Sequence, residues 1–589
     1  MKKVLSAGIF LPVVIYILAL QGCSNPAIVM PAGFPASGEF ATRMSMAEER
    51  LTGDNFEPLF TTEFVLADVN LNPDNPRRFQ EYSGDISGRY IEVISACRNP
   101  EYDAKLDEIV KKAVSFQKPD GRFGDPDLVF SEEQINSDHM PLLWGNGRLL
   151  VGLLEYYRKT GNRELLDAAV RLGDFFTGCY REVTPAVVNR LEGLGADGII
   201  CFTQYVEPLV MLSEITGDKK YAEVASRVYP VLPARGTLHS HGYLTTLRGV
   251  LNLYESGKDP LHLEFVQKAY NELVNSDDLT IYGSVKEYFG GKGDRDEGCS
   301  TSDFIRLSLH LFKLTGNGRY LEKAEFAMYN SLYFNQYFTG DFGHHTIDNT
   351  GSPSELMMAA WWCCTMSGLR ALQVIKNDYF IVNNEGEVEI NLFLEAGYSD
   401  ENISLSLRKK NYADGYHNYE LLVRQASGII SPLMVRNPSW ADDIKILING
   451  KNADQVQEGD YISVREKIEN GDRITIRLMY KTGITAGVKE LQLSEIKAPL
   501  GGILRYGPRI MAIDSKTGYT FLAEPNNNTV YANTIINSTA GDNYLSAMYK
   551  HDGYPSRSRV LFRPVSEMTF DGHPYMMVSF KFAPENHSK

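Results

Sequence analysis

The sequence predicts a multidomain α + β protein in which an (α/α)6 helical barrel is followed by a C-terminal antiparallel β-sandwich. Apolar residues recur with helical spacing from about residue 87 to residue 377, and after residue 377 they alternate with polar residues as in strands. The chain has 589 residues, of which 11% are aromatic and 23% are charged. This length allows several domains, and this composition is typical of packed globular proteins.

The first 22 residues are predicted to be a signal peptide. An apolar run from Ile9 to Leu20 follows a short basic start and is too short to span a bilayer. It ends in Leu-Gln-Gly-Cys23, which resembles the bacterial lipobox, in which the cysteine is lipidated; a plain secretory signal is the alternative. We expect Cys23 to anchor the chain to a membrane of the cell envelope, facing the periplasm or at the outer membrane or cell surface. Residues 23–60 then form a tether and N-terminal segment.

Residues 61–377 are expected to form the barrel, because a Thr-Gly phrase marks repeated corners between amphipathic runs. The phrase occurs at Thr160-Gly161, Thr216-Gly217 and Thr315-Gly316. Glycine after the last helical turn is a C-cap signal, so each phrase predicts the corner of a helical hairpin. The expected helices lie at about 87–98, 101–117, 144–160, 163–180, 203–216, 219–232, 241–256, 260–276, 302–315, 319–336 and 365–377, with one more before Ser87. An open helical solenoid is the alternative to a closed barrel.

The remaining chain is predicted to be β. Alternating runs separated by Gly, Asn and Asp turns predict a β-sandwich over residues 378–520, and the run 578–582 makes 521–589 a C-terminal β-rich segment. A helical barrel with a β-sandwich is frequent among carbohydrate enzymes, but a fold alone does not define a function.

Charge and cysteine content exclude two classes of protein. The 59 Lys and Arg residues against 74 Asp and Glu give a net charge of −15, which excludes nucleic acid as the expected partner. Seven cysteines in so long a chain do not form a disulfide framework. Besides Cys23, three of them lie in apolar helical segments and are expected to be buried core residues: Cys97, Cys179 and Cys201.

The other three cysteines lie just ahead of predicted helices. Cys299 precedes the helix at 304–314, and Cys363-Cys364 precedes the helix that includes 369–375. The expected capping residues are Ser302, Asp303, Thr365 and Ser367. The positive end of a helix dipole favours thiolate, and neighbouring hairpins of a barrel bring such ends to one rim.

These cysteines and a nearby carboxylate form a candidate zinc site. Glu297, Cys299, Cys363 and Cys364 offer four ligands of the types that bind Zn²⁺ tetrahedrally. A closed structural zinc site that joins two hairpins is one alternative. A disulfide is another, although adjacent cysteines pair with each other only under strain.

The chain resembles glycoside hydrolase family 127, the β-L-arabinofuranosidase-type enzymes. The motifs that carry the resemblance are Lys286-Glu287-Tyr288-Phe289, Glu297-Gly298-Cys299, Cys363-Cys364 and the sandwich segment Val435-Arg436-Asn437-Pro438-Ser439-Trp440. The order Glu-x-Cys, Cys-Cys and Pro-Ser-Trp is specific. The chain departs from the family's pattern at Thr365-Met366-Ser367, where the family commonly has Pro-Pro-Asn.

The resemblance implies a retaining exo-glycosidase with a zinc-bound thiolate as nucleophile. Cys363 would attack the anomeric carbon, and Glu287 would protonate the leaving oxygen and later activate water. Glu297, Cys299 and Cys364 would complete the zinc shell. The assignment of Cys363 rather than Cys364 as nucleophile comes wholly from the resemblance.

Five further residues are candidates for contact with a sugar: His241, His239, His344, Arg148 and Trp362. The histidines stand at helix starts or hairpin ends, where polar side chains of one rim suit a sugar pocket. Arg148 stands where the family tends to have histidine, and an arginine at the rim would suit a substrate that carries a carboxylate.

The leading hypothesis is an enzyme that removes non-reducing terminal sugars from plant-type oligo- or polysaccharides, either β-L-arabinofuranose or a related acidic pectic sugar. A catalytically inactive surface protein that binds glycans is the second hypothesis. The third is an unsaturated-uronide hydrolase or lyase on the same barrel, a class that needs neither zinc nor thiolates.

Overall fold

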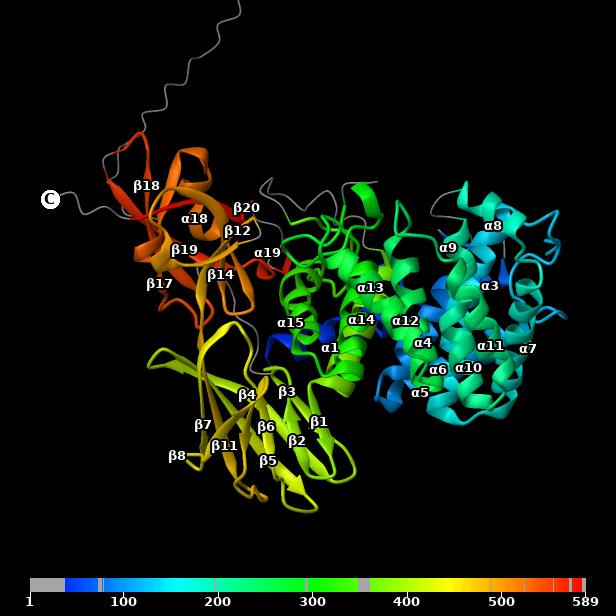
Figure 1. Cartoon of the computed structure of the whole chain (residues 1–589), viewed down its shortest axis with the longest axis horizontal. Helices are drawn as coiled ribbons and strands as arrows, with labels where there is room; N and C mark the ends of the chain where they lie inside the picture. The colour runs from blue at the N-terminus through cyan, green and yellow to red at the C-terminus, as the bar shows by residue number, and fades with distance from the viewer. Residues whose placement is uncertain are drawn as a thin grey trace, which may run out of the picture.

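The computed structural model describes residues 38–71, 77, 79–194, 198–291, 295–347, 361–487, 489–523, 525–554, 556–570 and 575–584. These residues form a helical domain and two β domains, with the helical domain on the right of Figure 1 and the β domains at lower and upper left. The long helices are α1 Glu39–Thr52, α4 Asp85–Ala96, α5 Asp103–Ser115, α6 Met140–Thr160, α7 Arg163–Tyr180, α10 Val206–Thr216, α11 Lys219–Val228, α12 Ser240–Gly257, α13 Pro260–Val274, α14 Gly298–Thr315, α15 Gly318–Ala327 and α17 Trp362–Val374. Short helices are α2 Thr62–Val65, α3 Ala67–Asn70, α8 Pro185–Glu192 and α9 Ile199–Phe202.

Six of the long helices form a closed inner ring. In order around the ring they are α4, α6, α10, α12, α14 and α17, and α17 packs back against α4. This closure confirms the (α/α)6 barrel and excludes the open solenoid, in which the first and last helices do not meet. Each inner helix except α17 is followed in the chain by an outer partner, namely α5, α7, α11, α13 or α15.

The sixth outer helix is α1. It is the first long helix in the described sequence, and it packs against α17, the last helix of the barrel. The prediction that residues 23–60 are a tether and N-terminal segment separate from the barrel is therefore wrong for α1. Its buried residues, which include Phe40, Ala47 and Leu51, belong to the same apolar core as the inner ring. The signal segment and Cys23 lie outside the described residues.

The hairpin corners have the geometry that their sequence predicts. The glycine after α6, α10 and α14 adopts a left-handed conformation, with φ of 68°, 75° and 65° at Gly161, Gly217 and Gly316. Glycine adopts this conformation without a steric cost. The side chain of the following Asn or Asp accepts a hydrogen bond from the backbone of the next helix, so one short phrase ends one helix and begins another.

The first β domain is a sandwich of two sheets. One has the order β1-β2-β6-β10-β9 and the other β3-β4-β5-β11-β7-β8. The strands are β1 Ile381–Asn384, β2 Glu387–Ile390, β3 Ala396–Ser399, β4 Ile403–Ala413, β5 Tyr416–Ala426, β6 Leu433–Arg436, β7 Ala441–Ile448, β8 Lys451–Asn452, β9 Gln455–Glu458, β10 Tyr461–Val464 and β11 Arg473–Tyr480. Its core is continuous with that of the barrel, so barrel and sandwich pack as one body.

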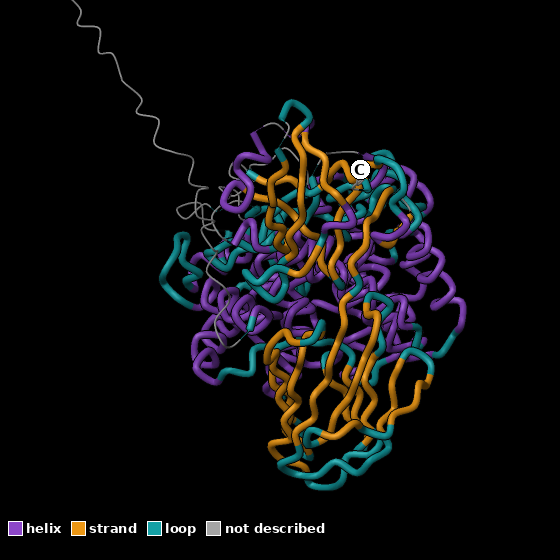
Figure 2. The backbone as a smooth tube through the Cα atoms, turned by 90° about the vertical axis from the view of Figure 1, so that its left-hand side faces the viewer, coloured by secondary structure: helices purple, strands orange, loops and turns teal. Residues whose placement is uncertain are grey.

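The second β domain begins earlier than predicted. Its sheet starts at β12, directly after Lys481, whereas the expected boundary at residue 520 falls inside helix α18, Ser515–Ala523. Alternating strands continue across Lys481 without a break in pattern, so the sequence does not mark the change of sheet. The strands are β12 Thr482–Ala486, β13 Lys489–Gln492, β14 Leu500–Tyr506, β15 Arg509–Asp514, β16 Asn528–Tyr531, β17 Ile536–Asn537, β18 Leu545–His551, β19 Arg557–Pro564, β20 Met576–Met577 and β21 Ser579–Ala583, with helix α19 at Glu567–Phe570. Figure 2 shows the two β domains one above the other, beside the helices.

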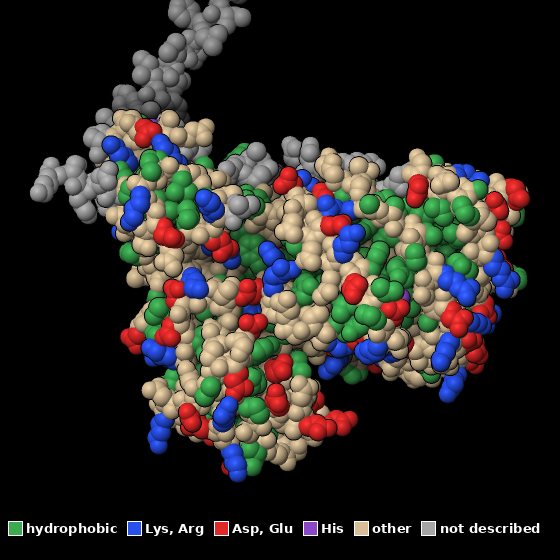
Figure 3. Space-filling model, in the orientation of Figure 1, with side chains coloured by type: hydrophobic (Ala, Val, Ile, Leu, Met, Phe, Trp, Pro, Cys, Tyr) green, Lys and Arg blue, Asp and Glu red, His purple; other side chains and the backbone are tan. Residues whose placement is uncertain are grey.

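The surface mixes charges of both signs. On the face in Figure 3, Lys and Arg lie interspersed with Asp and Glu over all three domains. Within the described residues, no helix combines the length and the apolar character needed to cross a bilayer.

Candidate active site

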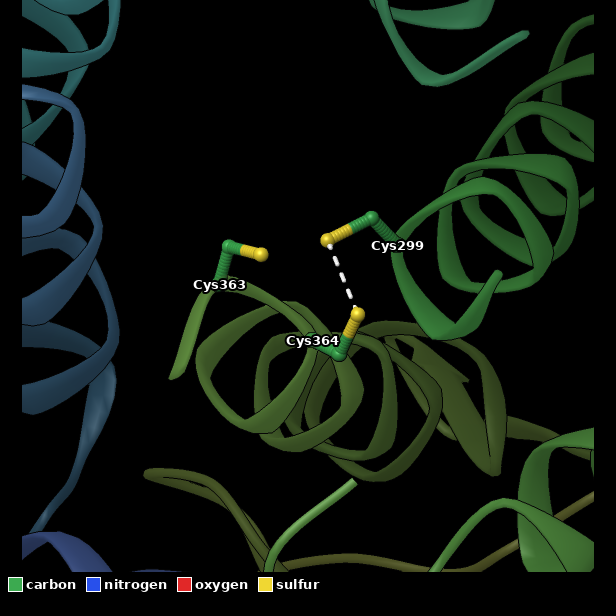
Figure 4. A group of neighbouring side chains, drawn as sticks. All are labelled: Cys299, Cys363 and Cys364. Atoms are coloured by element: carbon green, nitrogen blue, oxygen red, sulfur yellow. Dashed lines mark hydrogen bonds between the residues drawn. The ribbon is translucent and has the colours of Figure 1, made fainter. Parts of the chain in front are cut away.

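The first turns of α14 and α17 bring the three clustered cysteines together. Cys299 is the second residue of α14, and Cys363 and Cys364 follow Trp362 in α17. The sulfur atoms of all three converge, and Cys299 Sγ lies 3.6 Å from Cys364 Sγ (Figure 4). Gly298 permits this approach, because a Cβ there would lie 3.1 Å from the Cβ of Cys364.

The prediction that both clusters sit at helix N-termini is confirmed, but the predicted caps are wrong. Glu297 and Trp361 hold the N-cap positions, without side-chain caps. Ser302 and Asp303 lie inside α14, since the helix begins at Gly298. Thr365 lies inside α17, where its hydroxyl hydrogen-bonds Asp341 Oδ1 at 3.0 Å.

The three sulfurs differ in exposure and in protonation. Cys299 and Cys364 are fully buried, whereas Cys363 is half-buried, and none of the three is in a disulfide. Hydrogen bonds from the thiols of Cys299 and Cys364 lower the pKa of Cys363 well below its usual value. Burial raises the pKa of both donors. The half-buried Cys363 is therefore the cysteine of the three whose pKa shift favours the thiolate.

A carboxylate and two histidines extend the cluster. Nε2 of His344 lies 3.6 Å from Cys364 Sγ and 3.8 Å from Glu297 Oε1, and His239 Nε2 lies 4.0 Å from the same oxygen. Burial raises the pKa of Glu297, but the neighbouring histidines outweigh that effect and hold it well below its usual value. Nδ1 of His344 and of His239 is buried without a hydrogen-bond partner among the described residues.

The donor set fits a zinc ion. The ligand atoms form two overlapping groups that share Cys364: one is Cys299, Cys363 and Cys364, and the other is Glu297, His344 and Cys364. Within each group the atoms lie within 4.8 Å of one another. With Zn–S bonds of about 2.3 Å, the edge of a tetrahedron is about 3.8 Å, close to the observed sulfur separation. The three predicted cysteine ligands are thus together, and Glu297 joins them through Cys364 alone. His344 is a further ligand candidate, which the sequence assigned to sugar contact.

Glu287 lies beside the cluster on an irregular segment between α13 and α14. One of its oxygens is within 4.8 Å of both a ring nitrogen of His239 and a Glu297 oxygen. Its two oxygens pair with the Arg295 guanidinium, one of them at 2.9 Å, and its side chain is 13% exposed. The backbone carbonyl of Glu287 accepts a hydrogen bond from Ser240 N at 2.9 Å, which fixes the segment to the start of α12.

A buried chain of polar residues supports the cysteines, and sequence analysis missed it. Arg89 of α4 lies with Nη1 3.9 Å from Cys299 Sγ and donates from Nη2 to His241 Nε2 at 2.6 Å. The other ring nitrogen of His241 hydrogen-bonds Asp303, whose second oxygen pairs with Arg248. Burial raises the pKa of Asp303, but the charges of Arg248 and His241 hold it well below its usual value.

Two predicted sugar contacts are placed differently from expectation. Arg148 is 2% exposed and pairs with Glu207 at 3.0 Å, so it does not lie at the open rim as predicted. Its helix begins earlier than expected, at Met140, which places Arg148 two turns inside α6. Both ring nitrogens of His241 have partners, Asp303 and Arg89, so neither is free for a sugar.

The tryptophan that faces the site is not the predicted one. Trp362 packs edge-on against Phe64, with ring centroids 4.9 Å apart. Trp361 instead packs against the ring of His344 at 4.7 Å and beneath the guanidinium of Arg295 at 5.2 Å. Trp144 of α6 contacts the rings of both His239 and His241 at about 5.5 Å. Trp361 directly precedes Trp362, and only the start of α17 decides which of the two faces the cysteines.

The barrel, the sandwich and the thiolate–carboxylate cluster together are those of a glycoside hydrolase, and family comparison agrees. Residues 77–377 match the model of the β-L-arabinofuranosidase GH127 catalytic domain, and residues 387–480 match the GH127 middle domain. The chain belongs to glycoside hydrolase family 127. The two matched segments correspond to the barrel and the sandwich. No curated protein matches the chain.

Solved structures share the whole architecture. A GH127 β-L-arabinofuranosidase from Geobacillus stearothermophilus T6 is 14% identical, with a TM-score of 0.66 over 94% of this chain and 100% of the other. A second GH127 β-arabinofuranosidase is 16% identical, with a TM-score of 0.65 over 93% and 94% of the two chains. At such identities the likeness shows the fold of the chain, including its second β domain.

Proposed function

We propose that this protein is a retaining exo-glycosidase that removes terminal β-L-arabinofuranose from plant-type glycans, with Cys363 as nucleophile and Glu287 as acid and base. The observation that carries the proposal is the half-buried sulfur of Cys363 beside the buried sulfurs of Cys299 and Cys364, of which Cys364 also groups with Glu297. The arabinofuranose specificity is taken from the name of the family. The acidic-sugar alternative lacks support, because Arg148 is committed to Glu207.

The reaction runs in two displacements. Cys363 Sγ attacks the anomeric carbon while the glycosidic C–O bond breaks, and Glu287 gives its proton to the leaving oxygen. Water then attacks the same carbon, Glu287 takes the proton from the water, and the C–S bond breaks. Two inversions leave the configuration of the sugar unchanged. Before the first step Glu287 must leave Arg295, take up a proton from solvent and reach the substrate oxygen, and the 39% exposed Arg295 side chain has room to move.

A zinc ion would be held by Glu297, Cys299, Cys363 and Cys364, with His344 within reach of the same position. When bound, the ion supplies positive charge that keeps the thiols deprotonated at neutral pH. Arg89 adds a fixed positive charge on the side of Cys299, and burial excludes water from the sulfurs of Cys299 and Cys364. The lipobox-like segment at Cys23 supports a membrane-anchored enzyme of the cell envelope.

Two substitutions, Cys363→Ser and Glu287→Gln, test whether these residues act in the reaction or only in the structure of the zinc site. We expect Cys363→Ser to lose nearly all turnover of p-nitrophenyl β-L-arabinofuranoside, because a neutral hydroxyl is a far weaker nucleophile than a thiolate. Glu287→Gln should retain zinc by elemental analysis and lose about 10²–10⁴-fold in kcat. Cys179→Ser, which changes a buried cysteine of α7, serves as the control.

Full activity of Cys363→Ser would rule out the thiolate mechanism. If Glu287→Gln held its zinc and kept wild-type kcat, the zinc site would be a structural link between two hairpins, and Glu287 would have no catalytic role.

A further inference from the structure

A second cavity lies where the three domains meet, and no part of the mechanism uses it. It has a volume of about 440 Å³ and is lined by α1, the helical segment that follows α15, the sandwich and the second β domain. We call it the junction cavity and define it by Glu39, Tyr333, Lys409, Trp440, Arg509 and Glu567. None of the cysteines or acids of the active site lines it.

The walls of the junction cavity carry buried polar atoms without partners. Arg509 is 8% exposed and pairs through Nη2 with Glu39 at 2.6 Å, but its Nη1 has no hydrogen-bond partner among the described residues. The hydroxyl of the fully buried Tyr333 is likewise unpaired in the described part of the chain. Both atoms are closed off from solvent in this structure, so the polar groups that a ligand in the cavity would meet are the more accessible Glu395, Lys409 and Asp542.

The charges of the cavity favour a neutral ligand. Lys409 and Arg509 face Glu39, Glu395 and Glu567, so a free anion or cation would meet like charge. Burial raises the pKa of Glu567 to about 7 and lowers that of Lys409 to about 8, which further weakens the field of either sign. A molecule with many hydroxyl groups fits both sets of groups, because each hydroxyl donates to carboxylates and accepts from cations.

Aromatic rings complete the walls. Tyr329, Tyr333, Tyr419, Trp440 and Tyr480 all line the cavity, and Tyr419 and Tyr480 join through their hydroxyls at 2.8 Å. Aromatic rings among hydrogen-bonding groups suit a sugar, which has apolar faces and polar edges. One face of Tyr333 is covered by Arg43 and one face of Tyr329 by Arg509. The volume lies in the range of small-molecule sites and admits one or two sugar units.

We propose that the junction cavity is a second carbohydrate-binding site, which takes a neutral mono- or disaccharide unit apart from the catalytic centre. The proposal goes beyond the glycosidase function and does not depend on the mechanism. Because all three domains contribute to its walls, the cavity exists only when the barrel, the sandwich and the second β domain are packed together.

The test is calorimetric titration of L-arabinose, D-galactose and D-xylose into the whole protein, joined with crystals soaked in the same sugars at millimolar concentration. We expect density for one of these sugars in the junction cavity, within hydrogen-bonding reach of Lys409 and Glu395. Lys409→Met should weaken that binding event by about tenfold or more, since it removes a donor at the wall. Lys410→Met is the matched control, because the adjacent side chain is 54% exposed and pairs with Glu420 outside the cavity.

Glu395→Gln, with exposed Glu401→Gln as its control, repeats the test without removing a cation. Turnover of the p-nitrophenyl glycoside should stay at the wild-type level in all four variants, so loss of binding at the cavity is distinguishable from failure of the catalytic proposal. The second site would be overturned if sugar density appeared at the cysteine cluster alone. It would also be overturned if the Lys409 variant bound as tightly as the Lys410 variant, and the Glu395 variant as tightly as the Glu401 variant.

Discussion

At the scale of single residues, Arg89 connects the buried His241 with the cysteine cluster. Its guanidinium meets Cys299 Sγ, His241 Nε2, Ser367 Oγ at 2.9 Å and Asp85 Oδ1 at 2.8 Å. Burial lowers its pKa, but the charge of Asp85 and those of the cysteines outweigh that effect and raise it well above its usual value. Arg89 therefore stays charged and holds four groups of the site in register.

Arg89→Lys should lower kcat by about tenfold or more, and it should also lower the free energy of unfolding by about 1–3 kcal/mol, because buried partners of the guanidinium are left unpaired. Lysine keeps the charge but offers no planar fork, so it cannot serve all four partners at once. Steady-state kinetics and thermal unfolding measure the two effects, with Arg158→Lys on the 43% exposed rim of α6 as control. An unchanged kcat would contradict the role of Arg89.

Glu567 gives a pH dependence of stability. Burial, only partly offset by the nearby Arg563, raises its pKa from 4.5 to about 7. Between these pH values the unfolded chain has lost the proton that the folded state keeps. The free energy of unfolding therefore falls by about 1.4 kcal/mol per pH unit as the pH rises. Denaturant unfolding should show wild type and Glu567→Gln diverging from pH 4.5 to 7, with the variant the more stable above, whereas exposed Glu401→Gln should run parallel to wild type. Parallel curves for Glu567→Gln would contradict this.

The sequence alone places the cysteines at helix starts, but it does not reveal the buried polar residues that contact them. Local pattern places Cys299, Cys363 and Cys364 at helix starts, because apolar periodicity begins just after them. The Arg89–Cys299 contact spans 210 residues of sequence, and no local pattern announces it. Similarly, Asp303 reads as a helix cap but lies inside the helix, since its pairing with Arg248 and His241 depends on the packed barrel.

At the scale of elements, two inner helices meet backbone to backbone through glycines. A Cβ at Gly88 of α4 would lie 2.4 Å from backbone atoms of Arg148, and one at Gly152 of α6 would lie 2.4 Å from the carbonyl oxygen of Gly88. The two helices are thus closer than side chains allow, and this contact fixes Arg89 relative to α6.

Gly88→Ala should destabilise the protein by about 1–3 kcal/mol, because the helices must separate to admit a methyl group. Gly178→Ala is the control, since nothing lies within 4 Å of its Cβ position in α7. There the gain in helix propensity should instead stabilise by about 0.5–1 kcal/mol. Denaturant titration compares the two, and a Gly88→Ala protein as stable as wild type would contradict the close contact.

Helices were more predictable than their ends. The eleven expected segments from 87 to 377 each overlap a helix, because Gly and Asn at the corners act locally. The start of α14 was placed four residues late, since Gly298 and Cys299 look like loop residues until they pack against α17.

At the scale of the whole molecule, α1 supports the catalytic helix from outside the ring. Arg50 pairs with Asp341 at 2.6 Å, and Asp341 accepts from Thr365, the residue after Cys364. Arg43 donates to the carbonyl of Tyr333 at 3.1 Å and to that of Ser566, in the second β domain, at 2.9 Å. One helix at the N-terminal end therefore links the active site with the far end of the chain.

A chain shortened to begin at Gly38 should retain wild-type turnover, whereas one that begins at Asp54 should lose nearly all of it. The second deletion leaves Asp341 without Arg50 and uncovers the apolar face of α17, which costs several kcal/mol. Turnover and thermal unfolding of the two shortened proteins measure the difference. Equal activity would show that α1 is dispensable.

The broad architecture was predictable, because the change of hydrophobic period at residue 377 is a property of the chain alone. The boundary between the β domains and the sixth outer helix were not, because both depend on which strands and helices pair over long distances.

The closure of the ring also sets an order on the formation of the active site during synthesis. The sixth helical pair is made of α1 and α17, the first and last long helices of the barrel, and Arg50 and Asp341 are separated by 291 residues. Contacts between such distant segments form late in folding, since the intervening chain must first be ordered. Cys363 and Cys364 lie on that last helix, so a growing chain has no assembled thiol cluster until the barrel closes. The reactive centre and the completed fold therefore arise together, and a partly made chain cannot carry out the chemistry.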